Sequence, residues 1–267
     1  MLTLHQLLDI EARHLEDQVS ALQVLRPQDH FSLYRIAGST SMISSDKYDR
    51  KLNHTMGLGS FKQPTTDDLK IIEALYKDLG LKPQFDVSLP DNEETVTLLM
   101  GSGYVNTGGI DTFVHDLKRP IATNPRSFSI DRTTDVNSFI NTSVAGFATG
   151  GRSIDLLNLL SQVVSIRDNT HLYEARNVRG LLGTAALSIV ESDGDKIGYM
   201  YHDSTLTDAR GRGVHQALIG HRLQVSRDEN CTFAVALART SSGSARNLEK
   251  LGFVKILETH VFEPTVA

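Results

Sequence analysis

The sequence has few cysteines and no long apolar run. A single cysteine, Cys231, occurs in 267 residues, which excludes an internal disulfide and indicates a reducing compartment. No stretch is apolar over the length that a membrane-spanning helix needs, and residues 1–18 predict an acidic-flanked helix rather than a signal peptide. These absences predict a cytoplasmic globular protein without a membrane partner.

The sequence also lacks a surplus of positive charge and a metal-ligand pattern. Its net charge is −5, which argues against bulk binding of nucleic acid. The ten histidines show neither metal-ligand spacing nor a cysteine partner, so we predict no metal site. Hydrophobic residues make up 40% and charged residues 22% of the chain, as in an ordinary soluble protein. By length the chain can form one or two domains.

A basic glycine turn is the most informative stretch. Arg210-Gly211-Arg212-Gly213 follows a predicted strand, Ile197–Leu206, and precedes a predicted helix that begins at Val214. The glycines let the backbone approach a ligand closely, and a helix start presents unpaired N–H groups and the positive end of its dipole. With the two arginines, these features predict a site for phosphate or pyrophosphate. A Rossmann turn is excluded, because its third glycine would fall at Gln216.

The turn and a later stretch resemble two motifs of one superfamily. Arg210–His215 is similar to the acyl-CoA signature R/Q-x-x-G-x-G/A of the GNAT N-acetyltransferases. Asn247–Phe253 is similar to that family's second motif, which usually ends Y-x-K-x-G-F. The apolar run Cys231–Ala238 lies between the two motifs, as it does in the family. The resemblance covers residues 127–262, and the ordered pair is more specific than either motif alone.

The resemblance implies an α/β (α+β) fold and transfer of an acetyl group from acetyl-CoA to a primary amine. The amine would belong to a small molecule or a peptide, and the transfer would be direct, in a ternary complex. In the family, the backbone of the strand before the turn holds the pantetheine arm and the turn holds the pyrophosphate. Asn247 either caps the last helix or touches the arm. The residues carried over for acetyl-CoA are Asp203, Ser204, Thr205, Arg210, Gly211, Arg212, Gly213, Val214, His215, Gln216 and Asn247.

The N-terminal half repeats the order of elements of the C-terminal half. In each half a predicted helix, strand, helix and strand follow one another, and Ser102–Val105 aligns with Leu251–Val254. Gly57 and Gly59 have no arginine pair and are separated from the next helix by Pro64, so this half resembles a degenerate GNAT lobe without a CoA turn. We therefore expect two GNAT-like lobes, residues 1–122 and 123–267, each with a mixed, mostly antiparallel sheet flanked by helices. The alternative is an N-terminal decoration whose likeness is accidental.

Other local signals are short. Thr3 and Gln6 predict a capping box for the first helix, and Asn177–Gly180 predicts a hairpin turn. The serine-rich stretch Gly38–Asp49 predicts a mobile or substrate-covering loop.

The strand before the turn offers the acid–base candidates. Amine acetylation needs a base for the ammonium proton and an acid for the leaving thiolate. Asp203 or His202 is the predicted base, since burial can raise the pKa of a carboxyl toward neutral pH, and Tyr201 is the predicted acid. Strand alternation places Tyr201 and Asp203 on one face and His202 on the other, and a bulge near Asp203 would exchange the faces.

Two departures from the family pattern keep alternatives open. His215 stands where the family has glycine or alanine, and Leu248 stands where many members carry a tyrosine acid. A non-catalytic acyl-CoA sensor or interaction module is therefore the second hypothesis, and another phosphate-ligand enzyme is the third. Neither the acceptor amine nor the assembly follows from the sequence, and a homodimer is one assembly that it leaves open.

Overall fold

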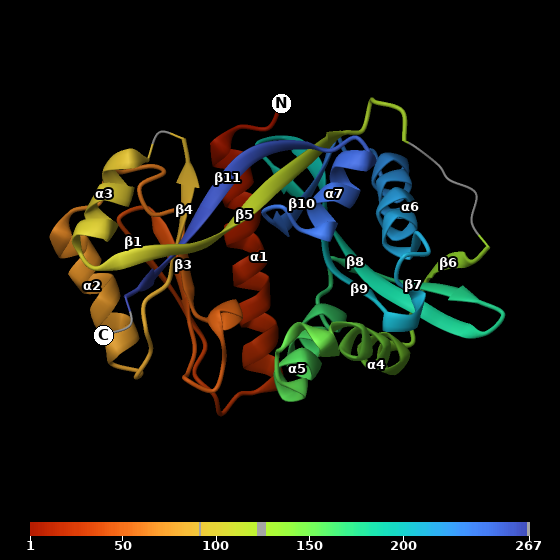
Figure 1. Cartoon of the computed structure of the whole chain (residues 1–267), viewed down its shortest axis with the longest axis horizontal. Helices are drawn as coiled ribbons and strands as arrows, with labels where there is room; N and C mark the ends of the chain where they lie inside the picture. Colours follow the sequence, from red (N-terminus) through yellow and green to blue (C-terminus); the bar gives the residue numbers. More distant parts are fainter. Residues whose placement is uncertain (91, 122–126, 266–267) are drawn as a thin grey trace. The chain divides into compact units, whose positions relative to one another are not determined.

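The computed structural model describes residues 1–90, 92–121 and 127–265, which fold into two compact units. The C-terminal unit comprises Met1–Ile10 and Phe113–Lys255, and the N-terminal unit comprises Glu11–Thr112 and Ile256–Ala267. The segments α1 (Leu4–Leu25), β5 (Tyr104–Asp116) and β11 (Val254–Pro264) contribute residues to both units (Figure 1). A single cut cannot reproduce these units, and the predicted boundary at residues 122–123 lies outside the described residues.

The C-terminal unit is built on a sheet with the strand order β5-β10-β9-β8-β7-β6. Its antiparallel pairs are β6 with β7, β7 with β8, and β8 with β9, whereas β9 and β10 are parallel. Asn177 pairs with Gly180 at the end of the β7–β8 hairpin, which confirms the predicted turn. The strands are β6 (Ser129–Arg132), β7 (Thr170–Asn177), β8 (Gly180–Ser192), β9 (Asp195–Thr205) and β10 (Phe233–Arg239).

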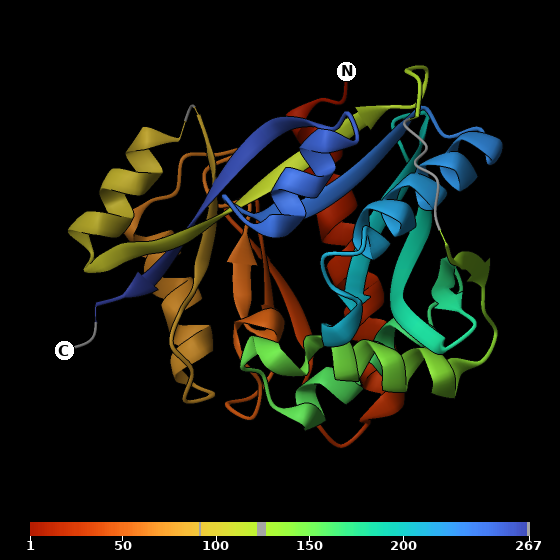
Figure 2. The same ribbon diagram turned by 45° about the vertical axis from the view of Figure 1, so that its right-hand side comes forward.

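Helices cover both faces of this sheet (Figures 1 and 2). On one face α4 (Val136–Phe147) and α5 (Ile154–Ser165) pack through Phe139 and Val164 against Leu172 and Ala186. On the other face α6 (Val214–Asp228) and α7 (Gly243–Lys250) form the larger core. This core includes Ala185 and Leu187 at alternate positions of β8, and Met200, the partner of Leu187 on β9.

The N-terminal unit has the strand order β1-β2-β3-β4-β11-β5. The pairs β1–β2, β2–β3 and β4–β11 are antiparallel, and β3 and β4 are parallel. The apolar cluster on one face joins these strands to α2 and α3 through residues such as Ile72, Phe85, Leu99 and Phe262. The elements are β1 (Ser32–Ile36), β2 (Ser39–Ile43), β3 (His54–Met56), α2 (Thr66–Lys77), β4 (Phe85–Leu89) and α3 (Glu93–Gly101).

The two units share one plan. The order β3-α2-β4-α3-β5 in one half matches β9-α6-β10-α7-β11 in the other, and in each the first two strands are parallel. Gly103 and Gly252 occupy the same place between helix and strand, and both have a φ of 87°. The predicted repeat and fold class, a mixed and mostly antiparallel architecture flanked by helices, are confirmed.

Two local predictions had different outcomes. The capping box is confirmed, because the Gln6 side chain accepts from the Thr3 N–H at 3.0 Å and Thr3 Oγ1 accepts from the Gln6 N–H at 3.2 Å. The predicted loop at Gly38–Asp49 was wrong over its first part, which forms the fully buried strand β2. Its serine hydroxyls are satisfied within the sheet: Ser41 bonds Thr55 at 2.8 Å and Ser39 bonds the Ile36 carbonyl.

Candidate functional site

The strands β9 and β10 part at one end. Their parallel pairing runs from Ile197 and Phe233 to Met200 and Ala236 and stops there, although β9 continues to Thr205 and β10 to Arg239. Beyond Met200, the edge of β9 that faces β10 has no ladder partner on β10. The structure thus shows a slot between two strands inside one unit.

A bulge lies in β9 next to this slot. Ala186 of β8 pairs with Tyr201, but Thr184 pairs with Ser204, so His202 and Asp203 oppose one residue. His202 has a left-handed φ of 56°. The predicted alternation was therefore wrong in detail, because the bulge turns His202 to the face of Tyr201 and turns Asp203 to the face of α6, as the following contacts show.

Tyr201 and His202 face α4 and α5. The Tyr201 ring packs against the Phe139 cluster, and its hydroxyl bonds Thr170 at 2.7 Å and Ser188 at 3.0 Å. His202 stacks near Phe139, and its Nε2 lies 3.1 Å from the Ser161 hydroxyl.

Asp203 faces α6, where its carboxylate accepts a hydrogen bond from the buried Arg222 guanidinium. His215 Nε2 lies 3.5 Å from the same carboxylate oxygen. Burial acts to raise the pKa of Asp203, but the charge of Arg222 and the hydrogen bond from His215 outweigh it and lower that pKa below its ordinary value. The expectation of a raised pKa was wrong, because it did not foresee a buried cation as partner.

The glycine turn leads directly into α6. Gly211 and Gly213 have φ values of 71° and 76°, and a Cβ at either position would meet open space. Among the described residues no side chain caps α6, whereas the Ser242 hydroxyl accepts from the Ala245 N–H at the start of α7. The first N–H groups of α6 are therefore left for a ligand. Anion binding at this helix start stays a prediction.

The two arginines of the turn differ. Arg210 donates at 2.9 Å to the Gly146 carbonyl and to the Thr149 hydroxyl, so it ties the turn to the end of α4. Arg212 is exposed. An anion at the turn would therefore meet mainly backbone N–H groups, because only Arg212 of the two arginines points outward without a bond to α4.

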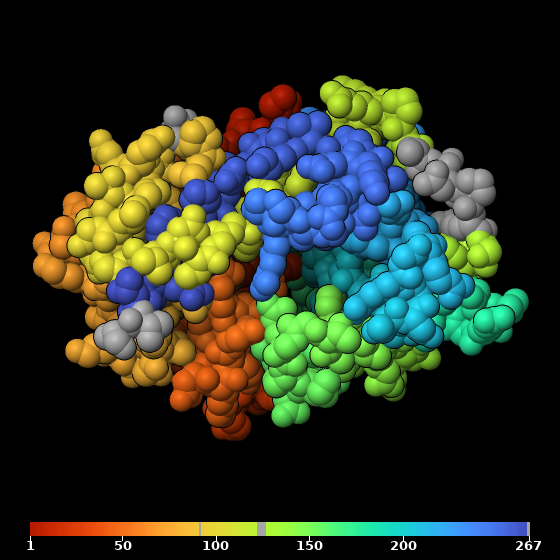
Figure 3. Space-filling view, viewed as in Figure 1, coloured from red at the N-terminus to blue at the C-terminus, as the bar shows by residue number. Residues whose placement is uncertain are grey.

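These elements surround a cavity of about 500 Å³. Figure 3 shows a hollow beside the dark blue surface of α7 and the lighter blue surface of the turn into α6. Sequence reasoning missed three of its residues, Ala209, Gly243 and Ser244. Gly243 and Ser244 precede Asn247 by about one helical turn, a spacing that could have revealed them. The lining residues are Asp203, Thr205, Ala209, Arg210, Gly211, Gly213, Val214, His215, Gln216, Gly243, Ser244 and Asn247.

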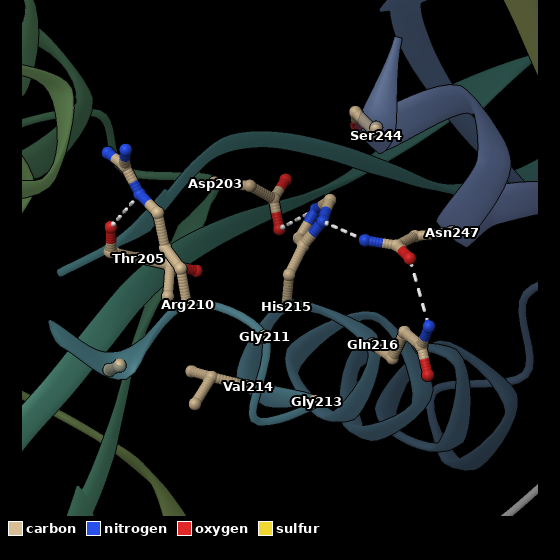
Figure 4. Close-up of a pocket in the computed structure, with 12 residues that line it drawn as sticks. Asp203, Thr205, Arg210, Gly211, Gly213, Val214, His215, Gln216, Ser244 and Asn247 are labelled. Atoms are coloured by element: carbon tan, nitrogen blue, oxygen red, sulfur yellow. Dashed lines mark hydrogen bonds and ion pairs between the residues drawn. The ribbon is translucent and has the colours of Figure 1, made fainter. Parts of the chain in front are cut away.

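A chain of hydrogen bonds crosses the cavity wall (Figure 4). The Gln216 amide donates to Asn247 Oδ1, and Asn247 Nδ2 donates to His215 Nδ1, both at 2.9 Å. With Nδ1 accepting, the His215 proton lies on Nε2, toward Asp203. The chain connects β9, α6 and α7.

Several predicted residues do not line the cavity. Tyr201 and His202 lie on the opposite face of β9, and the Ser204 hydroxyl points to α4, where it donates to the Ser143 carbonyl. Leu248 is buried in the core with 2% exposure, so Asn247 is the last cavity residue of α7. The described part of the chain contains no cluster of metal ligands and no helix long and apolar enough to cross a membrane.

Solved structures share this architecture along almost the whole chain, although neither a family sequence model nor a curated protein matches it. A GCN5-related N-acetyltransferase from Kribbella flavida is similar with 13% identity and a TM-score of 0.68, over 96% of both chains. A tandem GNAT protein from the clavulanic acid biosynthesis pathway has 9% identity and a TM-score of 0.59, over 95% of both chains. A GNAT-family acetyltransferase from Colwellia psychrerythraea has 12% identity and a TM-score of 0.57, over 99% of this chain and 98% of its own. The chain therefore has the fold of the GNAT N-acetyltransferases.

Proposed function

We propose that the chain is a GNAT-superfamily enzyme that transfers an acetyl group from acetyl-CoA to a primary amine in a ternary complex. The observation that carries the proposal is the uncapped start of α6, which opens with Gly211 and Gly213 into a cavity beside the parted strands β9 and β10. The helix start suits the pyrophosphate of an acyl-CoA and the parted strands suit its pantetheine arm, and the two features lie side by side.

The residues present fit acetyl-CoA. The N–H groups of the first turn of α6 bind the pyrophosphate, supported by the helix dipole. The edge of β9 at residues 203–205, which has no ladder partner on β10, hydrogen-bonds the pantetheine arm as a neighbouring strand would. The Thr205 carbonyl is excepted, because it accepts from Arg210 Nε at 3.4 Å. The carboxamide of Asn247 on α7 also lines the cavity, where it can hydrogen-bond the amides of the pantetheine arm.

The transfer needs one proton acceptor and one proton donor. The amine nitrogen attacks the thioester carbonyl carbon, the carbon–sulfur bond breaks, and the CoA thiolate takes up a proton. Asp203, with its lowered pKa and its Arg222 partner, is a weak base for this step, so the base role passes to His202 or to water. Tyr201 is the proposed donor, with its hydroxyl held by Thr170 and Ser188 on the face of β9 opposite the cavity. This role requires the thioester to pass between β9 and β10 to that face, where His202 also lies.

The test is calorimetric titration with CoA and with ADP, followed by a screen for thiol release from acetyl-CoA over polyamines, aminoglycosides, amino acids and peptides. We expect CoA to bind more tightly than ADP, because only CoA fills the strand gap. Cys231 should contribute little to the thiol signal, because its thiol is buried and burial raises its pKa to about 11. Equal binding of ADP and CoA would favour another phosphate-ligand enzyme.

One observation favours a second candidate, a non-catalytic acyl-CoA sensor or interaction module. Leu248 replaces the usual tyrosine and points into the core, and no tyrosine occurs among the described residues that line the cavity. Tight CoA binding without thiol release on any amine class would select this candidate over the enzyme.

A further inference from the structure

Arg222 is a fully buried cation that does not line the cavity and has no part in the proposed acetyl transfer. Its exposure is 0%, and it is the largest of the fully buried side chains among the described residues. Burying a guanidinium is costly unless its donors are paired. Here Nε donates to the Leu218 carbonyl at 3.1 Å, Nη1 to the Ala186 carbonyl at 2.8 Å and the Tyr201 carbonyl at 3.5 Å, and Nη2 to Asp203.

These contacts coincide with the bulge in β9. Ala186 and Tyr201 are the last regular pair before the register shift, and their carbonyls are the ones that Arg222 binds. A bulge interrupts the strand ladder, and buried carbonyls that lose a ladder partner need another donor. The planar fork of Arg222 supplies it from α6. On the other face, His202 takes up the left-handed conformation of the bulge with its ring near Phe139 and Phe147.

The bulge determines what faces the cavity. Because two residues are accommodated opposite one, the Asp203 carboxylate turns toward α6 and lines the cavity instead of packing on α4. There it lies between the Arg222 guanidinium and His215 Nε2, and His215 is joined to Asn247. One continuous polar chain, from Arg222 through Asp203 and His215 to Asn247, therefore links the three elements around the cavity.

We propose that Arg222 is a positioning residue of the acyl-CoA slot. It holds the β9 bulge, and through Asp203 and His215 it fixes the wall that the CoA arm contacts, without touching the ligand. This inference rests on the proposed function for its ligand, but the hold on the bulge is a property of the protein alone. A purely structural Arg222 would only neutralise Asp203, and the two roles predict different outcomes when the charge of Asp203 is removed as well.

The experiment compares the full-length wild type with Asp203→Asn, Arg222→Lys, Arg222→Met and the double variant Arg222→Met/Asp203→Asn. Arg227→Met is the matched control. Arg227 lies on the same helix and also donates to backbone carbonyls, those of Leu117 and Arg119, but it does not line the cavity. The readouts are the Kd for CoA by calorimetry, the Tm, and amide hydrogen exchange in peptides that cover residues 198–206.

We expect the double variant to bind CoA about tenfold more weakly than Asp203→Asn alone, with at least tenfold faster exchange at residues 198–206. Arg222→Lys keeps the charge but not the fork, so it should recover only part of the affinity. Arg227→Met should lower the Tm and leave both the Kd and this exchange unchanged. If Arg222→Met does not fold, the lysine and double variants, which leave no unpaired carboxylate, carry the comparison.

The proposal is overturned if the double variant binds CoA as Asp203→Asn does, or if Arg222→Lys restores wild-type affinity and exchange. Unchanged exchange at residues 198–206 in every Arg222 variant also overturns it. If the wild-type protein binds no CoA, the proposed function fails instead, and the exchange measurement still decides whether Arg222 holds the bulge.

Discussion

At the scale of single residues, Glu11 illustrates how burial sets a pH dependence. Burial first, and repulsion from Asp86 second, raise the pKa of the Glu11 carboxyl to about 7, against weaker opposing effects of Thr112 and Lys51. A raised carboxyl pKa favours the folded state below the unfolded-state value, and this contribution is lost as the pH rises through the folded-state value. The folded state therefore loses this contribution to its stability between about pH 4.5 and about pH 7.

Glu11→Gln should therefore stabilise the protein progressively as the pH rises. The amide cannot ionise, so it avoids the cost of a buried charge, and the gain at pH 8 over pH 5 should reach at most about 3 kcal/mol. Urea unfolding of both proteins at pH 5, 6, 7 and 8 measures it. Glu16→Gln, an exposed change on the same helix, is the control that should show no such trend. A constant difference across this range would contradict the assignment.

Tyr201 gives a second prediction at this scale, for catalysis. Tyr201→Phe removes only a hydroxyl that bonds Thr170 and Ser188 and does not line the CoA cavity. If this phenol is the donor, turnover should fall by about 10²–10⁴ while the Kd for acetyl-CoA stays nearly unchanged. Tyr199→Phe, a change on the neighbouring ring of the same strand, is the control for packing. Full turnover in Tyr201→Phe would pass the donor role to water or to another group.

At the scale of elements, the turn into α6 depends on left-handed glycine. A Cβ at Gly213 meets no atom, so space is not the limit there. The φ of 76° is the limit, since β-branched residues avoid this conformation. Gly213→Val should shift the turn, misalign the N–H groups of α6 and weaken CoA binding at least tenfold.

Calorimetry on Gly213→Val and on Gly150→Val tests this prediction. Gly150 also has open space around a Cβ, but it is not in the left-handed region, so its variant should keep the wild-type Kd. Unchanged affinity in Gly213→Val would place the phosphate site elsewhere.

The elements around the glycine turn show which features could be predicted from the sequence. The strand, the glycine turn and the helix from Val214 were predictable, because periodicity, glycine and a helix start act locally. The bulge was foreseen only as an alternative, since its position depends on pairing with β8. Arg222 follows Leu218 by four residues on the buried face of α6, but its partner Asp203 reaches it only through the bulge. The pKa of Asp203 was therefore predicted with the wrong sign.

At the scale of the whole molecule, the repeat could be recognised in the sequence because the order of helices and strands survives divergence. The boundary at residues 122–123 stays a prediction, whereas the contributions of α1 and β11 to both units could not be read from the sequence. The units take their segments from both ends of the chain, since α1 and β11 each contribute to both. Hydrophobic periodicity indicates whether a segment is a helix or a strand but does not indicate which unit the segment joins. The serine-rich strand β2 shows the same limit, because the hydroxyl partner of Ser41 is Thr55 on β3, 14 residues along the chain.

Because the two halves repeat one plan, each half could bind its own CoA, but the starts of α2 and α6 differ. In the N-terminal half, Gly57 and Gly59 also have positive φ, but α2 begins only after Thr65. There Thr65 and Asp68 form a complete capping box, and Asp67 adds a second carboxylate to the first turn. The N–H groups that would bind phosphate are thus satisfied, and the local charge is negative. We therefore predict one CoA per chain.

Titration of the wild-type protein with CoA should give a stoichiometry of one, and Gly213→Val should abolish or weaken that single event. The matched change in the other half is Thr65→Ala, which removes the cap of α2 and should lower stability by about 1 kcal/mol without altering CoA binding. Two equivalent binding events per chain would contradict the degenerate state of the N-terminal half. A CoA-binding event of wild-type affinity that remains in Gly213→Val and is lost when Thr65→Ala is added would contradict it as well.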